Sequence, residues 1–217
     1  MVPKKLLPDV EIQINRIRKL FRILLLVNLS FIVICMLLFG DRFNFWNDAF
    51  SSFGSTVTPT GHSNTASVLI FISGIVISSI ICFKISNGFS YLQNVPHARL
   101  KNQLFRITGT GYLIMMMPCN IVDVIHSLGA AIVFGTLWFF TALLLIEMKH
   151  KLKPFRYYLF QLLLHGTVLP YAYTYFTGSI TKQVFQKFAV IGLILTISFT
   201  VKYSFLSYHQ SDQQEDK

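Results

Sequence analysis

The chain has 217 residues, of which 53% are hydrophobic and only 13% are charged, and its mean hydropathy is +0.55. A soluble domain is about 25% charged, so this composition excludes an ordinary water-soluble globule and indicates an integral membrane protein. Lysine and arginine outnumber acidic residues by 19 to 9. We expect no nucleic-acid partner, because proteins that bind nucleic acid gather their basic residues on one face of a polar domain.

The first apolar run, residues 23–40, contains no charged residue and follows a basic N-terminal segment, residues 1–22. A helix needs about 20 mostly apolar residues to cross the hydrocarbon core, so we expect this run to form the first span. Within residues 10–22, Ile and Leu alternate with Arg and Lys at roughly helical spacing. This pattern fits either an amphipathic lead-in at the inner interface or a solvated basic flank.

The longest stretch outside the apolar runs, residues 41–64, follows the first span and is rich in aromatic, serine, threonine and glycine residues. A loop of this length often carries function. It contains Ser51, Ser52 and His62, side chains that can bind polar ligands or a metal ion.

Five further apolar runs follow, and we expect each to cross the membrane as a helix: residues 67–83, 104–119, 124–146, 157–176 and 184–206. Lys187 and Lys202 lie near the two ends of the last run, where their side chains can extend to the interface. The polar residues 207–217 are expected to form a disordered cytoplasmic tail.

Small residues recur at four-residue spacing in two of these runs, Gly74 with Ser78 and Ala131 with Gly135. Small side chains let membrane helices approach closely. We therefore expect the second, third and fourth helices to form the tightest part of the bundle.

The basic residues indicate the orientation of the chain. Six spans put both termini on one side, and sixteen of the nineteen lysines and arginines fall on that side or at its boundary. Basic segments stay in the cytoplasm, and they attract anionic lipid head groups. The sequence thus predicts an all-α, polytopic membrane protein, a bundle of six transmembrane helices over residues 23–206 with both termini cytoplasmic.

Asp123 and His126 stand at the outer start of the fourth run, three residues apart on one helix face. They are candidate catalytic residues, because a carboxylate beside an imidazole can act as an acid/base couple. With His62 they are also candidate zinc ligands, although their spacing is not a known zinc signature. The alternative is structural: Asn120 or Asp123 caps the helix and His126 lies at the wet interface.

His165 is the deepest ionisable residue in the predicted spans, midway along the fifth run. Ionisable groups at this depth are functional candidates. Its role is either that of a neutral residue that hydrogen-bonds a neighbouring helix or that of a catalytic or ligand-binding group.

Two short patterns resemble a known superfamily. One is Phe-Ser-Ser-Phe-Gly followed by a proline, in the first outer loop, and the other is His-Ser-Leu-Gly-Ala ending in a phenylalanine, at the start of the fourth span. Over about residues 20–206 the chain resembles the damage-regulated autophagy modulator family, its Frag-type relatives in GPI-anchor lipid remodelling, and prokaryotic relatives of unknown function. The residues that carry the resemblance are Ser51, Gly54, Pro59, Asn120, His126, Gly129, Ala130 and Phe134.

The resemblance implies an integral membrane protein linked to lipids or membrane trafficking. Ser52 and Thr60 stand where the relatives often carry an acidic residue, which weakens an enzymatic interpretation. In this picture His126 hydrogen-bonds the loop of residues 51–54, which folds over it and forms one outer-side polar site.

We therefore expect a lipid-handling or membrane-organising protein that is non-enzymatic, needs no cofactor and has membrane lipids as its partners. The alternative is a metal-dependent intramembrane lipid hydrolase or acyltransferase that uses Asp123 and His126 around zinc. A transporter is disfavoured, because the sequence has no internal repeat and little charge within its apolar runs.

Overall fold

The computed structural model describes residues 8–92 and 95–214, with the side chains of residues 10–92 and 95–204. This part of the chain folds into six α-helices and one short 3-10 helix, which confirms the all-α fold class. The helices are α1 (Pro8–Leu38), η1 (Phe50–Gly54), α2 (Thr65–Ser90), α3 (Ala98–Met115), α4 (Asp123–Glu147), α5 (Pro154–Phe176) and α6 (Lys182–Gln214).

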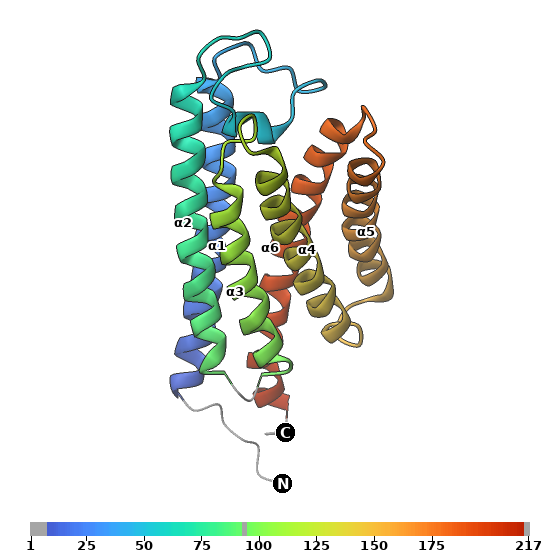
Figure 1. The fold of residues 1–217 in the computed structure, drawn as a ribbon. Helices are drawn as coiled ribbons and strands as arrows, with labels where there is room; N and C mark the ends of the chain where they lie inside the picture. The colour runs from blue at the N-terminus through green and yellow to red at the C-terminus, as the bar shows by residue number, and fades with distance from the viewer. Residues whose placement is uncertain (1–7, 93–94, 215–217) are drawn as a thin grey trace.

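The helices run alternately up and down a single bundle (Figure 1). The loop between α1 and α2 covers one end, together with the α3–α4 and α5–α6 connections; we call this the loop end. The start of α1 and the end of α6 lie at the other, terminal end. This arrangement places both extremities of the described chain on the same side of the bundle.

Four helices of the described chain are long and apolar enough to cross a membrane, over Val10–Leu38, Thr65–Ser90, Asp123–Glu147 and Lys182–Ser204. They are α1, α2, α4 and α6. Their length and composition fit an integral membrane protein with several spans. The other two helices, α3 and α5, have 18 and 23 residues and are less apolar.

Several helices extend beyond the apolar runs. α1 continues through the basic segment because Ile14, Ile17 and Phe21 recur on one face and are buried in the core. This part of the chain is thus an integral part of the first helix rather than a solvated flank. α3 ends at Met115, three residues before Pro118, which cannot donate a backbone hydrogen bond. α6 continues to Gln214, into the tail expected to be disordered, and residues 215–217 lie outside the described residues.

The centre of the bundle is a cluster of phenylalanines contributed by α1, α2, α3 and α4. The rings of Phe21, Phe89, Phe105 and Phe140 contact one another with centroids 4.8 to 6.3 Å apart. α5 lies at the side, where it packs mainly on α6 (Figure 1). The tight part of the bundle therefore includes α1 as well as the three helices expected from small-residue spacing.

The close approach of α3 and α4 occurs at Gly129, where a Cβ would overlap the Met115 backbone and lie 2.8 Å from the Gly111 carbonyl oxygen. The spacing of Ala131 and Gly135 was misleading. Ala131 is exposed, and a Cβ at Gly135 would have no described neighbour within 4 Å. Spacing alone does not tell which face of a helix meets its neighbour.

At the terminal end, a buried ion pair joins α3 to α4. Lys101, which is 1% exposed, donates to Glu147 Oε2 at 2.7 Å, and His97 Nδ1 lies 2.8 Å from Glu147 Oε1. His97 precedes α3 with a φ of 53°, a left-handed conformation that is uncommon for a residue other than glycine. The pair fixes the positions of the two helices relative to each other at this end.

Candidate functional site

The loop between α1 and α2 is fastened to the α3–α4 connection by hydrogen bonds with two consecutive residues, Cys119 and Asn120. The Thr56 amide donates to Asn120 Oδ1 and Asn120 Nδ2 donates to Thr56 Oγ1, both at 2.9 Å. Cys119 donates its backbone N–H to the Gly54 carbonyl at 3.3 Å and its thiol to the Ser51 carbonyl at 3.2 Å. Burial raises the pKa of this thiol, so it keeps the proton that it donates. The two sequence patterns thus meet in space.

Asn64, which is 1% exposed, holds this loop through hydrogen bonds of its side chain to loop backbone groups. Its Nδ2 donates to the carbonyls of Ser52 and Ser55, at 3.3 and 2.9 Å, and its Oδ1 accepts from the Gly40 amide at 3.1 Å. Our sequence reasoning missed this residue. The available signal was an asparagine at the end of the polar stretch 41–64, shortly before the second apolar run, where it can satisfy backbone groups of the loop.

Gly54 lies directly over His126. A Cβ at Gly54 would lie 2.8 Å from Phe71 and 3.5 Å from His126 Cε1. His126 is 2% exposed, and its ring stacks on Phe71 with centroids 6.0 Å apart. Only a residue without a side chain lets the loop approach this closely.

The hydrogen bond expected between His126 and residues 51–54 is replaced by a different one. His126 Nδ1 lies 2.8 Å from the Met117 carbonyl, and because a carbonyl only accepts, Nδ1 carries the hydrogen. The Gly54 carbonyl is already bonded to Cys119. The expected cap is also wrong: the residue before α4 is Val122, and no side-chain cap is formed there among the described residues.

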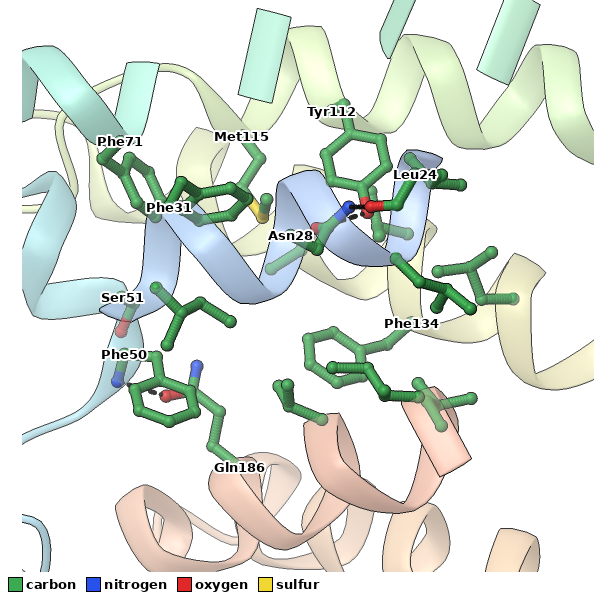
Figure 2. A pocket seen from close by; sticks show the side chains of 18 of the residues that line it. Leu24, Asn28, Phe31, Phe50, Ser51, Phe71, Tyr112, Met115, Phe134 and Gln186 are labelled. Carbon is green, nitrogen blue, oxygen red and sulfur yellow. Dashed lines mark hydrogen bonds between the residues drawn. The ribbon is translucent and has the colours of Figure 1, made fainter. Parts of the chain in front are cut away.

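An apolar cavity of about 120 Å³ lies between α1, α3, α4 and α6, under η1 (Figure 2). Phenylalanines line much of its wall, among them Phe31, Phe50, Phe71 and Phe134. Phe134 is one of the residues singled out by the resemblance. A dry cavity of about 150 Å³ in another protein accepts benzene, so this cavity has room for a segment of one hydrocarbon chain.

Besides Ser51 and His126, three polar side chains interrupt the apolar wall: Asn28, Tyr112 and Gln186. Asn28 accepts from the Tyr112 hydroxyl at 3.1 Å (Figure 2). It also donates to Ser78 Oγ at 3.1 Å and so links α1, α2 and α3. Gln186 Oε1 accepts from the Phe50 amide at 2.9 Å and so ties η1 to α6. Sequence reasoning missed all three, although Asn28 is one of the few polar residues in the first apolar run.

A second, polar cavity of about 260 Å³ adjoins the first toward the loop end; we call it the polar vestibule. Ser51, His126, Ala130 and Gln186 line both cavities. The remaining wall of the vestibule carries Ala49, Asp123, Ser127, Tyr171, Tyr175, Lys182 and Gln183. Asp123 Oδ1 accepts from Ser127 Oγ at 3.3 Å. Of the predicted site residues, the structure therefore gathers Ser51, Asp123, His126 and Ala130 around one polar space.

His62 and Pro59 belong to a separate part of the loop. His62 Nδ1 lies 2.6 Å from Asp41 Oδ1, and Thr60 donates to Asp41 Oδ2 at 2.6 Å, while Pro59 is exposed in the turn between them. Hydrogen bonds from Thr58, Thr60 and His62 lower the pKa of Asp41 to about 2. No three His, Cys, Asp or Glu residues of the described chain gather closely enough to hold a metal ion.

His165 takes part in a chain of hydrogen bonds between α4 and α5. Trp138 Nε1 donates to His165 Nδ1 at 3.1 Å, so Nδ1 bears the lone pair and Nε2–H donates to Gln161 Oε1 at 2.7 Å. Gln161 Nε2 then donates to the Tyr157 hydroxyl at 3.1 Å. These contacts match the interhelical hydrogen-bonding role rather than that of a ligand.

Lys187 does not extend to the interface as expected. It is 0% exposed, donates to the Gln183 carbonyl at 3.1 Å, and lies 5.1 Å from the centre of the Phe45 ring. Phe43 and Phe45 of the loop between α1 and α2 lie over the ammonium group, and the face of an aromatic ring attracts a cation. Lys187 thus helps to hold the loop on α6.

No protein-family model matches the chain, and no curated protein or solved structure matches it. The resemblance described above therefore remains a prediction.

Proposed function

We propose that this chain is a lipid-handling protein of the membrane, with six transmembrane helices and both termini in the cytoplasm, which binds a lipid from the outer leaflet without chemical conversion. The observation that carries the proposal is the pairing of two adjoining cavities, one apolar and one polar. Their order along the bundle matches the order of an acyl chain and its head group in a leaflet.

The topology belongs to the same proposal. α3 and α5, with 18 and 23 residues, are shorter than the four long apolar helices but continue the up-and-down order of the bundle (Figure 1). The terminal end would then face the cytoplasm, because sixteen of the nineteen lysines and arginines belong to the sequence segments assigned to that side. The polar vestibule would accordingly open toward the outer leaflet.

The contacts of His126 favour binding over acid/base chemistry. Its Nδ1 hydrogen goes to the Met117 carbonyl and not to Asp123, whose carboxylate accepts from Ser127. The resulting arrangement orients His126 as part of the cavity wall. Among the residues that the structure describes, no group of three possible metal ligands supports the alternative of a metal-dependent hydrolase or acyltransferase.

Filling the apolar cavity tests the proposal. Val190 lines the cavity, whereas its neighbour Ile191 is 44% exposed on the outside of α6. The full chain would be released from nanodiscs and its bound lipid counted by native mass spectrometry. We expect the wild type and Ile191→Phe to retain a lipid and Val190→Phe to lose it. A folded Val190→Phe variant that retains the lipid to the same extent would contradict the proposal.

A further inference from the structure

The charged residues of the polar vestibule narrow the class of lipid that it can bind. The wall includes one carboxylate, Asp123, at the start of α4 and one ammonium group, Lys182, at the start of α6. With histidine counted as neutral, these two charges cancel. The other polar residues lining the vestibule are Ser51, Ser127, Tyr171, Tyr175, Gln183 and Gln186.

The two charges are available to a ligand. Among the described residues no ion pair joins Asp123 to Lys182, and both residues are exposed at the rim. They approach the same space from different helices. A pair of opposite charges that line one cavity without contacting each other matches a ligand that carries both signs.

Two tyrosines in the wall of the vestibule support binding of the positively charged part of such a ligand. Tyr171 and Tyr175 lie one helical turn apart on α5, with ring centroids 6.1 Å apart at 63°. Aromatic faces attract ammonium groups, quaternary ones included. Gln186 fixes Tyr171 through a contact of 3.5 Å between Gln186 Nε2 and the tyrosine hydroxyl, while its Oε1 holds η1.

We propose that the vestibule selects a lipid head group that contains both a phosphate and an ammonium and has no net charge. This inference rests on the function proposed above. The phosphate would lie near Lys182 and Gln183, the ammonium near Asp123 and the tyrosines, and one acyl chain would enter the apolar cavity. A singly anionic head group would place its charge beside Asp123 with only one ammonium to offset it. Proteins that recognise anionic lipids use clusters of basic residues instead.

The test compares four lipids with identical acyl chains: phosphatidylcholine, phosphatidylethanolamine, phosphatidylglycerol and diacylglycerol. Their affinities for the purified full chain would be measured by native mass spectrometry titration. The wild type should bind both zwitterionic lipids more tightly than phosphatidylglycerol. The ratio of the phosphatidylcholine affinity to the phosphatidylethanolamine affinity then shows which of the two ammonium head groups the vestibule prefers.

Two variants, each of which removes one charge from the vestibule, test whether these charges determine the head-group preference. Asp123→Asn should weaken phosphatidylcholine binding about two- to fivefold and reduce its advantage over phosphatidylglycerol, as expected for a charge pair in a wet site. Lys182→Gln should weaken both phospholipids by a similar factor. Neither should change diacylglycerol binding. The matched controls are Asp48→Asn and Arg42→Gln, which alter charges of the outer loop that do not line the vestibule.

The outcomes separate this inference from the proposed function. Equal binding of all phospholipids, a preference for phosphatidylglycerol, or variants that behave like the controls would overturn the head-group assignment. If diacylglycerol still binds and Val190→Phe abolishes that binding, the lipid cavity itself stands. If no lipid binds and Val190→Phe has no effect, both proposals fail together.

Discussion

Thr56 and Asn120 hold each other by two hydrogen bonds of 2.9 Å, one in each direction, across 64 residues of sequence. The reciprocal pattern fixes the orientation of the Asn120 amide, because its oxygen must face the Thr56 N–H. It also joins the loop between α1 and α2 to the connection between α3 and α4. The position of Ser51 and Gly54 over His126 depends on this junction.

Replacing Asn120 should loosen the junction without unfolding the bundle. Asn120→Ala removes both hydrogen bonds, whereas Asn120→Asp keeps the acceptor for the Thr56 amide. One such bond is worth about 1 kcal/mol, so amide hydrogen exchange at Thr56 should become about fivefold faster in Asn120→Ala and change less in Asn120→Asp. Unchanged exchange in Asn120→Ala would show that the loop is held elsewhere.

Gly129 should tolerate no side chain. Gly129→Ala would push α4 away from the backbone of Met115 and Gly111, and overpacking of this kind costs about 1 to 3 kcal/mol. The control is Gly135→Ala in the same helix, where a Cβ meets no described neighbour. Thermal unfolding in detergent should show a lower midpoint for the first variant only. Equal midpoints would mean that the two helices separate easily.

Asn28 should contribute to stability through its partners. Asn28→Leu leaves the Tyr112 hydroxyl and Ser78 without their hydrogen bonds, which in a membrane bundle costs about 1 kcal/mol. Adding Tyr112→Phe removes one of the orphaned groups and should restore part of the loss. The free energy of unfolding of both variants checks this. A double variant less stable than the single one would refute the explanation.

The ion pair at the terminal end should be costly to break from one side. Glu147→Gln leaves the buried Lys101 ammonium without a counter-charge, and we expect a loss of about 3 kcal/mol. Replacing both residues, Lys101→Met with Glu147→Leu, should be far milder. Denaturant unfolding distinguishes the two cases. A double variant as unstable as Glu147→Gln would show that helix packing rather than charge is responsible.

The turn around Asp41 should respond to acid. Its folded-state pKa, about 2, is below the ordinary 3.8, so the ionised carboxylate stabilises the turn. That contribution is complete above pH 3.8 and is lost as the pH falls toward 2. Carboxyl NMR shifts should titrate accordingly. Thr60→Val removes a hydrogen bond to Asp41 and should raise this pKa, and an unchanged titration would contradict its role.

Much of the helical architecture could be predicted from the sequence, because each apolar run is long and the breaks carry polar residues, glycine or proline. The meeting of Ser51, Gly54 and His126 also followed from the two patterns. These residues are small or polar, and they lie at ends of apolar runs that the alternating direction of the helices brings to the same end of the bundle. Their association therefore needed no knowledge of helix rotation.

The remaining contacts depend on the rotation of each helix about its axis, which apolar composition does not set. The apolar composition of α1 does not show that Asn28 faces Tyr112. Likewise, the composition of α6 does not show that Gln186 faces η1. The same uncertainty made the spacing of Ala131 and Gly135 misleading. It also hid the burial of Lys101 and Lys187, because a long cationic side chain at a helix end usually reaches water.

The unbroken length of α1 has a mechanical consequence. At 1.5 Å per residue its 31 residues extend about 46 Å, well beyond a hydrocarbon core of about 30 Å. Phe21, Asn28 and Phe31 of this helix form part of the cavity wall, while its basic residues, Arg16, Arg18, Lys19 and Arg22, lie in the half of the helix nearer the terminal end. Because one continuous helix joins the terminal end to the cavity wall, a tilt of its first turns would displace that wall as well.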